Sequence, residues 1–549
     1  MAFDLGRTPT VTDCTGAVRK EHTVVKSFAE RVSQLARLEP ERASVICEGR
    51  TYTRAAIAEH TAHLARCLAE LGIAPGARVG VVARNSELHL VCALATSQVG
   101  AVLVPLHFRS APLEARRNLE DSGCAVVIFD EESAPAYAQA AGGTTFRGVL
   151  DDIGSRSDAP VTAPAGWLLL SEVCRRATRD PQPVAFDESA VAMIHYTSGS
   201  TGRAKGVCLT YRNIEASWEN WEHEMSVGAD DTVLTITPFA HVGGLQTFTL
   251  QVLVAGGTVV IQRHFDEDEA LRQVERHGVT LMFCVPRIYA EMVHSPEFAV
   301  RDLSSLRCAV VGGAAVSQDL IEAYARRGVP LCPSWGMTET CGGATLLPHG
   351  QISTLPHSVG HPMLHVEIRL EDAEGNPVGA NTPGNLQVRG ESIAQGYWVL
   401  GEVLPLGVAP QGWFDTGDVA EIDEGGNLSI TGRSSDRIIS GGENIYPAEI
   451  ECALSGCSGV GECAVIGVPD EQWGETPLVF VVAPPDQEPP SLEVAREYLA
   501  LRISRYKLPR ALVVIDALPR TGQTGKVDRR ALVALAARLP TRLRANPQG

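Results

Sequence analysis

The sequence predicts an α/β fold: a large N-terminal domain of layered αβ sheets with a small β-barrel-like unit, and a smaller mobile C-terminal α+β domain. Apolar strands alternate with helical segments as far as Arg326, short glycine-rich strands follow at 359–430, and the composition changes again beyond Arg433. We place the domain boundary there, so that residues 1–434 form the N-terminal domain and residues 435–549 the C-terminal domain. With 549 residues and 44% hydrophobic content, the chain can bury several cores.

The first part of the chain has the rhythm of a parallel sheet joined by helices. Ser27 with Glu30 has the spacing of a capping box, and Thr53 is a second helix cap. Hydrophobic periodicity then predicts strands and helices in alternation, for which right-handed crossovers are the rule. The expected elements are a helix to Leu38, a hairpin of 45–47 and 50–52, a helix from Thr53 to Leu71, strand 79–83, helix 87–99, strand 101–104, a helix from Ala111 and strand 125–129.

Beyond this segment the pattern is interrupted once and then returns. Glycine, proline, serine and aspartate interrupt 131–187, so we expect an irregular connection there. The alternation that follows predicts a second sheet layer, and the closely spaced glycines at 359–430 predict a small antiparallel unit. The expected elements are strands 190–194 and 207–209, helix 211–225, strand 232–235, helix 246–253, strand 258–261, helix 266–277, strand 281–285, helix 287–294, strand 308–311, helix 317–326, helix 449–454, strands 463–468 and 478–483, helix 492–503 and strand 511–514.

Composition argues against several classes of function. A net charge of −18 opposes attraction to nucleic acid and to a membrane of anionic lipid, so an anionic substrate needs a local cluster of cations. The longest apolar stretch, 88–106, is interrupted by polar residues and predicts a buried helix and strand rather than a membrane span. The first twenty-odd residues are charged and have no apolar core, so we expect no secretory signal there. The 14 cysteines show neither the spacing of a zinc site nor that of a disulfide framework. We expect a cytoplasmic protein with free thiols.

The stretch from Tyr196 to Gly206, rich in hydroxyls, glycines and cations, has the composition of a phosphate-binding loop. Glycines let backbone N–H groups approach an anion, hydroxyls add rotatable donors, and Lys205 adds a mobile charge. The stretch lacks the Walker A spacing and lies between two expected strands, so the loop itself must supply the phosphate ligands. A flexible surface linker is the alternative, although linkers seldom carry lysine and arginine between two hydrophobic strands.

Two further motifs carry carboxylates. The segment 335–340 places Glu339 beside Thr338 after an apolar run, an arrangement that suits Mg²⁺ and a phosphate oxygen. The turn-rich segment 412–418 presents Asp418, which can accept from both hydroxyls of a ribose. Taken singly, a helix cap explains the first motif and an Asx turn explains the second.

Two motifs near the C-terminus suggest motion. Residues 432–451 are charged and contain glycines at the expected domain junction, which predicts a hinge followed by a mobile loop, with a hairpin on a Gly-Gly turn as the alternative. Residues 519–529 place Lys526 on a glycine-flanked loop, where a lysine can swing into a site and stabilise charge on a transferring phosphoryl group. A solvated lysine is the alternative for that residue taken alone.

The five motifs, in this order between Tyr196 and Arg529, resemble the adenylate-forming superfamily of acyl-CoA synthetases, acid–CoA ligases, nonribosomal adenylation domains and luciferases. The resemblance covers nearly the whole chain. It implies that a carboxylic acid reacts with ATP and Mg²⁺ to an acyl-adenylate, after which a thiol displaces AMP. The loop Ser-Gly-Gly-Glu-Asn-Ile-Tyr-Pro after Ile439 is most similar to the branch that uses coenzyme A as acceptor. The resemblance thus implies an acid–CoA ligase, with an adenylating ligase for an amine or a carrier-protein thiol as the alternative.

The resemblance also implies roles for individual residues. Lys526 would bridge the attacking carboxylate and the α-phosphate, Glu339 would hold Mg²⁺, and Thr338 would contact the α-phosphate. His241 would lie near the reacting carboxyl. The residues implied in nucleotide binding are Thr197, Ser198, Gly199, Ser200, Thr201, Gly202, Lys205, Gly312, Gly313, Ala314, Trp335, Gly336, Met337, Thr338, Asp418, Ile430, Arg433 and Lys526. The residues implied in the coenzyme A channel and hinge are Ser435, Asp436, Ser440, Gly441, Gly442 and Glu443.

The acid pocket that the resemblance implies is apolar. Its members would be Phe239, His241, Val242, Gly243, Phe283, Cys284, Gly312 and Met337. None of them offers a carboxylate to the ammonium of an amino acid, and an unpaired charge is costly to bury, so we expect an uncharged acyl or aryl acid. Taken alone, His241 is also compatible with a structural role. The length and shape of the acid stay open.

Two positions depart from the pattern of the superfamily. Ser435, followed by Asp436, stands where some relatives have Asp or Lys at the hinge, so the hinge residue is left open. Trp335 stands where many relatives have Tyr. A non-catalytic adenylate-binding protein is disfavoured because all the expected nucleotide-binding motifs occur together. A homodimer is left open.

Overall fold

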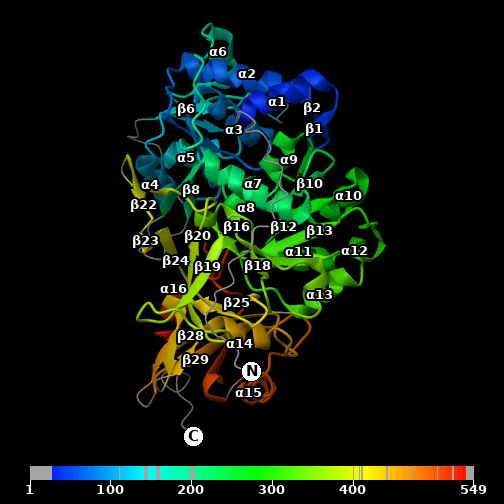
Figure 1. Ribbon diagram of the computed structural model, residues 1–549, viewed down its shortest axis with the longest axis vertical. Helices are drawn as coiled ribbons and strands as arrows, with labels where there is room; N and C mark the ends of the chain where they lie inside the picture. The colour runs from blue at the N-terminus through cyan, green and yellow to red at the C-terminus, as the bar shows by residue number, and fades with distance from the viewer. Residues whose placement is uncertain are drawn as a thin grey trace, which may run out of the picture.

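The computed structural model describes residues 27–110, 112–140, 146–155, 161–197, 204–355, 357–399, 401–406, 408–409, 412–440, 443–470, 473–503, 505–521 and 525–539. The molecule is elongated, with the first elements at one end and the last elements at the other (Figure 1). Two large, mainly parallel sheets and a small antiparallel sheet make up most of it, and a further sheet belongs to the C-terminal part. The expected α/β class is therefore confirmed.

The first large sheet has the strand order β22-β21-β9-β8-β4-β3-β5-β6-β7. Its strands are β3 Arg78–Val82, β4 Val102–Leu106, β5 Val126–Phe129, β6 Arg147–Leu150, β7 Leu168–Leu169, β8 Val191–Thr197, β9 Lys205–Thr210, β21 Gly396–Val399 and β22 Glu402–Pro405. The accompanying helices are α1 Phe28–Leu38, α2 Arg54–Glu70, α3 Glu87–Val99, α4 Pro112–Ser122, α5 Ala134–Ala140 and α6 Leu170–Arg176. The predicted caps Ser27 and Thr53 both accept a backbone N–H, and Ser27 forms the full capping box with Glu30.

The prediction of an irregular connection at 131–187 is wrong. Helices α5 and α6 and strands β6 and β7 lie in this segment, and the two strands extend the first sheet beyond β5. Each of these elements has seven residues or fewer. Elements of this length are too short to show a recognisable hydrophobic period among the surrounding glycines and prolines.

The second large sheet has the order β14-β13-β12-β10-β11-β1-β2 and confirms the expected second layer. Its strands are β1 Ala43–Cys47, β2 Arg50–Thr53, β10 Thr232–Thr235, β11 Thr258–Ile261, β12 Leu281–Cys284, β13 Cys308–Gly312 and β14 Leu331–Ser334. Its helices are α7 Tyr211–Met225, α8 Val242–Leu245, α9 Thr249–Ala255, α10 Glu267–His277, α11 Pro286–His294, α12 Glu297–Val300 and α13 Gln318–Ala325. The early hairpin joins this later sheet, since β1 runs parallel to β11. The helix expected at 246–253 begins at Thr249 instead, because the chain first forms the short helix α8.

The short strands after β14 confirm the predicted antiparallel unit. A five-stranded sheet contains β19 Glu367–Glu371, β20 Gly384–Arg389, β23 Val408–Ala409, β24 Trp413–Ile422 and β25 Leu428–Arg433. Two pairs precede it, β15 Gly336–Met337 with β16 Gly342–Gly343 and β17 Thr345–Leu346 with β18 His361–Pro362. The segment 412–418, expected to be rich in turns, is mostly extended, since Trp413 to Asp418 open the ten-residue strand β24. The Asx alternative is met inside the strand, where the Gly417 N–H donates to the Asp415 carboxylate at 2.9 Å. Its polar residues are held in the strand by partners such as the Leu386 carbonyl, which accepts from the Thr416 hydroxyl at 2.8 Å.

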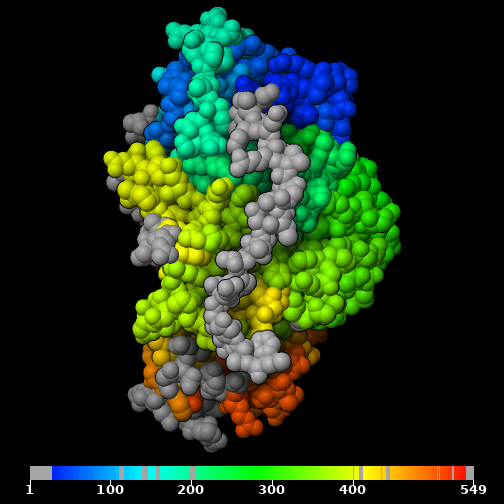
Figure 2. Space-filling model, viewed as in Figure 1, coloured from blue at the N-terminus to red at the C-terminus, as the bar shows by residue number. Residues whose placement is uncertain are grey.

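The C-terminal elements gather at one end of the molecule, coloured orange to red in Figure 2. They comprise β26 Ile438–Ser440, β27 Glu443–Ile445, α14 Pro447–Leu454, β28 Glu462–Asp470, β29 Gly474–Val482, α15 Leu492–Ala500, β30 Ala511–Val514 and α16 Arg529–Ala536. Two apolar clusters, drawn only from residues beyond Arg437, lie among these elements. Strands β26 and β27 pair antiparallel, so the hairpin alternative describes the local structure of this motif. Short 3₁₀ helices occupy Thr338–Thr340, His349–Gln351, Ser434–Asp436 and Arg505–Lys507.

The two large sheets meet at the carboxyl ends of their strands. Asn85, just after β3, donates to the carbonyls of Ile236 and Thr237, just after β10, at 3.2 and 2.9 Å. Asp130, after β5, forms a buried ion pair with Arg263, after β11, at 2.6 Å. Ligand sites in open α/β sheets lie outside the carboxyl ends of the strands, so this contact fixes where a cleft can form. No helix among the described residues is both long and apolar enough to cross a membrane.

Arg263→Ala leaves the buried Asp130 carboxylate without its strongest partner, so we expect a loss of about 3 kcal/mol in apparent stability. The measurement is urea unfolding followed by circular dichroism. Arg287→Ala is the matched control, because Arg287 pairs with Glu291 on an exposed helix face, and such pairs contribute less than about 1 kcal/mol. Equal shifts for the two variants would contradict a stabilising role for the contact between the sheets.

Candidate active site

The expected phosphate loop connects two paired strands. Strands β8 and β9 run antiparallel and bring Thr197 opposite Lys205, and the Thr197 hydroxyl faces the Lys205 carbonyl at 3.5 Å. The expectation of flanking strands is thus confirmed. The predicted ligands Ser198, Gly199, Ser200, Thr201 and Gly202 lie outside the described residues.

Tyr397 on β21 connects Lys205, the cation predicted to bind phosphate, to the predicted metal ligand Glu339, and sequence analysis missed it. Its hydroxyl donates to the Glu339 carboxylate at 2.8 Å, and the Lys205 ammonium lies 4.8 Å from the centre of its ring. The backbone carbonyl of Glu339 accepts from the Ala394 N–H at 2.7 Å, which ties the same turn to the chain before β21. Tyr397 therefore sets the position of one cation and one carboxylate at once. The sequence signal was only an aromatic pair after a glycine.

Trp335, Asp418 and Arg433 form a connected group. The Trp335 indole N–H donates to one oxygen of Asp418 at 3.0 Å, and Arg433 pairs with the other oxygen at 2.7 Å. Asp418 and Arg433 face each other across β24 and β25. Burial raises the pKa of Asp418, while Arg433, Trp335 and Lys526 act in the opposite direction. The indole here orients the predicted ribose ligand, a contact that the sequence did not indicate.

The predicted adenine-slot residues lie at the ends of neighbouring strands. Gly312 ends β13, where a Cβ would approach the Ser334 carbonyl to 2.7 Å. Gly313 has a φ of +81° and Ala314 is exposed beside it. Gly336 and Met337 form β15, and Thr338 and Glu339 begin the 3₁₀ turn that follows. Ile430 on β25 packs against the main hydrophobic core.

Lys526 lies among the charges of this group although it comes from the C-terminal part of the chain. Asp418, Glu339 and Arg433 are all close enough for their charges to act on its pKa. Burial and Arg433 lower the pKa of Lys526, whereas Asp418 and Glu339 act to raise it. Lys526 is exposed to solvent.

Arg529 anchors the loop that carries Lys526. Its guanidinium binds both oxygens of Glu451, at 2.8 and 3.0 Å, and one oxygen of Asp436 at 3.1 Å. The Lys526 carbonyl accepts from the Thr521 N–H at 2.8 Å. Arg529 therefore links the segment that follows Lys526 to helix α14 and to the 434–436 turn, which belongs to the predicted hinge segment.

The predicted acid-pocket residues gather around helix α8. His241 is the residue before α8 and is half-buried, and its ring centre lies 5.3 Å from that of His107, which sequence analysis missed. Burial, His241 and Arg109 lower the pKa of His107 to about 3, so its ring is neutral near pH 7. Phe239, Val242 and Cys284 are buried. Gly243 and the partly exposed Phe283 are in contact, because a Cβ on Gly243 would overlap the Phe283 ring.

The predicted channel and hinge residues are only partly described. Ser440 is buried and pairs with Glu443 in the β26–β27 hairpin. Gly441 and Gly442 lie outside the described residues, as do the side chains of Ser435 and Glu443. Asp436 is the member of this set whose side-chain contact is defined, through Arg529.

The donor set around Glu339 fits Mg²⁺ that arrives with phosphate. The described residues contain no group of three or more His, Cys, Asp or Glu able to hold a metal alone. Mg²⁺ commonly keeps several waters and takes one or two carboxylates together with substrate phosphates. The Glu339 carboxylate is buried and accepts from the Tyr397 hydroxyl, so it could supply one such ligand.

Sequence comparison agrees with this geometry. The profile of the AMP-binding enzyme family matches residues 32–398, and that of the AMP-binding enzyme C-terminal domain matches residues 449–526. The chain belongs to the AMP-binding enzyme family. The resemblance to adenylate-forming enzymes is thereby confirmed. Because the profiles leave 399–448 unassigned, the domain boundary between 434 and 435 stays a prediction.

Named relatives of this AMP-binding enzyme are similar over almost their full length. A feruloyl-CoA synthase of Amycolatopsis sp is 36% identical over 492 residues, 90% of this chain and 95% of that protein. The long-chain-fatty-acid–CoA ligase FadD13 of Mycobacterium tuberculosis is 34% identical over 509 residues, 92% of this chain and 97% of its own. The structure of o-succinylbenzoate coenzyme A synthetase (MenE) from Bacillus subtilis, in complex with ATP and magnesium ion, superposes with a TM-score of 0.79 at 27% identity, covering 92% of this chain and 99% of that one.

Tyr397→Phe removes the hydroxyl that holds Glu339, and hydrogen bonds to charged groups contribute about 1.5–3 kcal/mol. We expect ATP–pyrophosphate exchange to fall about tenfold or more and to require more Mg²⁺ for half-maximal rate. Tyr397→Leu also removes the ring beneath Lys205 and should lose more. Tyr52→Phe is the matched control, because the Tyr52 hydroxyl also donates to a carboxylate, that of Glu87. An unchanged Mg²⁺ requirement in Tyr397→Phe would contradict the proposed positioning.

Proposed function

We infer that this protein is an AMP-forming acid–CoA ligase. An oxygen of the carboxylic acid attacks the α-phosphorus of ATP, pyrophosphate leaves, and the thiol of coenzyme A then displaces AMP from the acyl carbon. The observation that carries this inference is that Lys526 lies close enough to Glu339, Asp418 and Arg433 for their charges to act on its pKa. Glu339 lies in the first matched family segment, Asp418 and Arg433 lie between the two segments, and Lys526 ends the second, so residues far apart in the sequence approach one another.

The first step needs neutralised charge more than a strong base. A carboxylate is a weak nucleophile, and it approaches a polyphosphate that repels it, so positioning and cations supply most of the rate. We assign this role to Lys526, whose ammonium would lie between the attacking oxygen and the α-phosphate. Mg²⁺ bound by Glu339 would supply further charge neutralisation at the phosphates.

The remaining residues bind and orient. Thr197, Lys205 and the loop between them are assigned to the β- and γ-phosphates, and Thr338 is assigned to the α-phosphate. Asp418, oriented by Trp335 and Arg433, would accept from the ribose hydroxyls. An ionised carboxylate is the stronger acceptor and offers both oxygens, so the opposition of Arg433 and Trp335 to the effect of burial would favour binding.

The second step requires the Lys526 loop to leave. We assign the pivot to Ser435 and Asp436, and the Ser440–Glu443 hairpin to the coenzyme A channel that forms afterwards. Because Arg529 joins Asp436 to the Lys526 loop, movement at the pivot is transmitted directly to the lysine. Coenzyme A is favoured as acceptor by the named activities of the relatives.

The acceptor is tested by incubating the protein with ATP, Mg²⁺ and a panel of acids, with coenzyme A, an amine panel or a phosphopantetheinyl carrier protein. We expect AMP release that depends on coenzyme A, with one thioester formed per AMP. AMP release that depends only on amines or on the carrier protein would assign the alternative acceptor and contradict coenzyme A.

Lys526→Ala should lower adenylation by at least about a hundredfold, since it removes the charge at the reacting phosphoryl group. Thioester formation from supplied acyl-adenylate and coenzyme A should largely survive, because Lys526 has left the site by then. Arg530→Ala, an exposed cation on the same segment, is the control. Equal losses in both half-reactions would refute the assigned role.

A further inference from the structure

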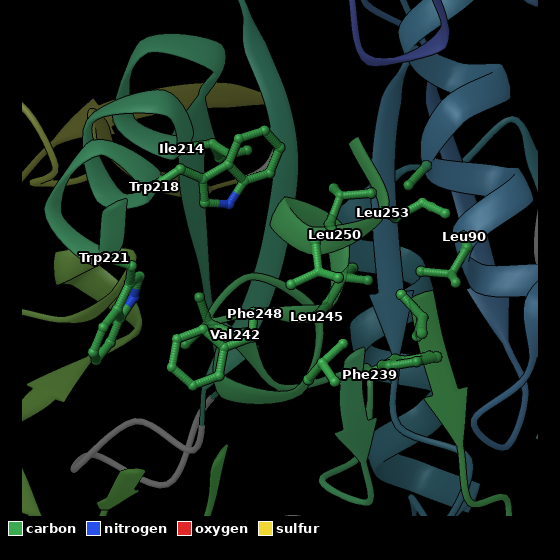
Figure 3. Packing of buried hydrophobic residues seen from close by; sticks show 14 of the residues in the cluster. Leu90, Ile214, Trp218, Trp221, Phe239, Val242, Leu245, Phe248, Leu250 and Leu253 are labelled. Atoms are coloured by element: carbon green, nitrogen blue, oxygen red, sulfur yellow. The ribbon is translucent and has the colours of Figure 1, made fainter. Parts of the chain in front are cut away.

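The segment that leads into His241 is anchored in the hydrophobic core on both sides. Phe239 before it and Leu245 after it are fully buried, and Val242 packs with them among the apolar side chains shown in Figure 3. His241 itself is half-buried and directly precedes helix α8. Because the flanks are buried, the backbone polar groups of this segment need partners inside the protein.

Two side chains from the first sheet supply such partners. The Asn85 amide donates to the Thr237 carbonyl at 2.9 Å, and its oxygen accepts from the Phe239 N–H at 2.9 Å. The Ala240 carbonyl, directly before His241, is bonded to Nδ1 of His195 on β8, at 3.1 Å. A carbonyl can only accept, so Nδ1 of His195 carries the proton.

His195 is a buried and neutral donor. Its side chain is 1% exposed. Burial lowers the pKa of His195 to about 4 against the effect of the Ala240 carbonyl, and the charge of His241 also acts to lower it. The ring is therefore neutral near pH 7. Its other nitrogen, Nε2, has no hydrogen-bond partner among the described residues, so the bond to Ala240 fixes the orientation of the imidazole.

The strand that carries His195 also leads into the phosphate loop. His195 and Thr197 are two residues apart on β8, so their side chains leave the same face of the sheet. Both residues pair with β9, opposite Val207 and Lys205. His195 thus joins the strand that leads into the predicted phosphate-binding residues to the segment that carries His241.

We propose that His195 is a positioning residue, whose hydrogen bond to the Ala240 carbonyl sets the place of His241 relative to the phosphate loop. The inference rests on the proposed ligase function, in which His241 lies near the reacting carboxyl and the loop holds ATP. Small errors in the alignment of two reacting groups lower the rate strongly. Loss of this hydrogen bond should therefore lower kcat for adenylation more than it raises KM for ATP.

The test compares three variants of His195. His195→Leu has no donor, His195→Asn has an amide nitrogen where Nδ1 lies, and His195→Gln has its amide nitrogen farther along the side chain. ATP–pyrophosphate exchange is measured with benzoate, phenylacetate, 4-hydroxycinnamate and octanoate, and kcat and KM are determined with the best acid. Because a buried carbonyl is left without its donor, we expect kcat to fall about tenfold in the Leu and Gln variants, with KM for ATP changed less than about twofold. His195→Asn should keep kcat within about threefold of the wild type, since it restores the donor.

A double-mutant cycle separates positioning from a purely structural role. In the His241→Ala background, His195→Leu should lower exchange by less than about twofold, because residues that act through one another are not additive. Thermal melting checks that each variant is folded. Tyr289→Phe is the matched control with an unchanged rate, since it removes another buried hydrogen bond to backbone carbonyls, those of Met282 and Val310.

Two results would overturn the inference while leaving the ligase function in place. One is an equal loss from His195→Leu with and without His241, and the other is an equal loss in folded His195→Leu and His195→Asn. If His195→Leu does not fold, His195→Gln takes its place in both comparisons. Absence of exchange by the wild type with every acid would remove the ligase function and this inference together.

Discussion

The proposed active site depends on the position of one ammonium group, that of Lys526, near two buried carboxylates. Lys526 lies near Asp418 and Glu339, and both carboxylates already have partners of their own, Trp335 and Arg433 for the first and Tyr397 for the second. In a protein with a net charge of −18, a polyphosphate finds little general attraction. A site for ATP therefore needs local cations, and we propose that Lys205, Arg433 and Lys526 supply them.

The fold explains why these groups can meet. Two parallel sheets place the carboxyl ends of their strands together, joined by the Asn85 contacts and the buried pair of Arg263 with Asp130. The small antiparallel sheet then presents Asp418 and Arg433 as neighbours on β24 and β25. The C-terminal part adds Lys526 from outside, on a loop that Arg529 ties to the 434–436 turn. In the proposed reaction, adenylation needs Lys526 beside the carboxyl group of the acid, whereas thioester formation needs the thiol of coenzyme A there. Because Lys526 belongs to the C-terminal part of the chain, it can leave before the thiol arrives.

Local features of the fold were predictable because local physics determines them. Ser27 and Thr53 cap their helices as their spacing indicates, and the buried α3–β4 segment follows from an apolar run interrupted by a glycine. Long-range pairings were not, because nothing near β1 in sequence indicates β11, and nothing near β21 indicates the first sheet. The elements of 131–187 were missed because they are too short for periodicity.

The candidate active site shows the same difference between features that the sequence predicts and long-range contacts that it does not. The order of five motifs predicted that Glu339, Asp418, Arg433 and Lys526 belong to one cleft, and the structure brings these four together. The contacts that orient them were invisible, because Tyr397 is 58 residues from Glu339 and Trp335 is 83 residues from Asp418. Phe283 was predicted as a wall residue, but its position between two glycines emerges only from the packing.

The most direct test of the adenylate account follows a carboxylic acid labelled at both carboxylate oxygens through one turnover in the presence of ATP, Mg²⁺ and coenzyme A. If the acid attacks the α-phosphorus, mass spectrometry will find one labelled oxygen in AMP and none in pyrophosphate. Label in inorganic phosphate accompanied by ADP would mean attack at the γ-phosphorus, and would contradict the roles assigned to Lys526, Thr338 and Glu339.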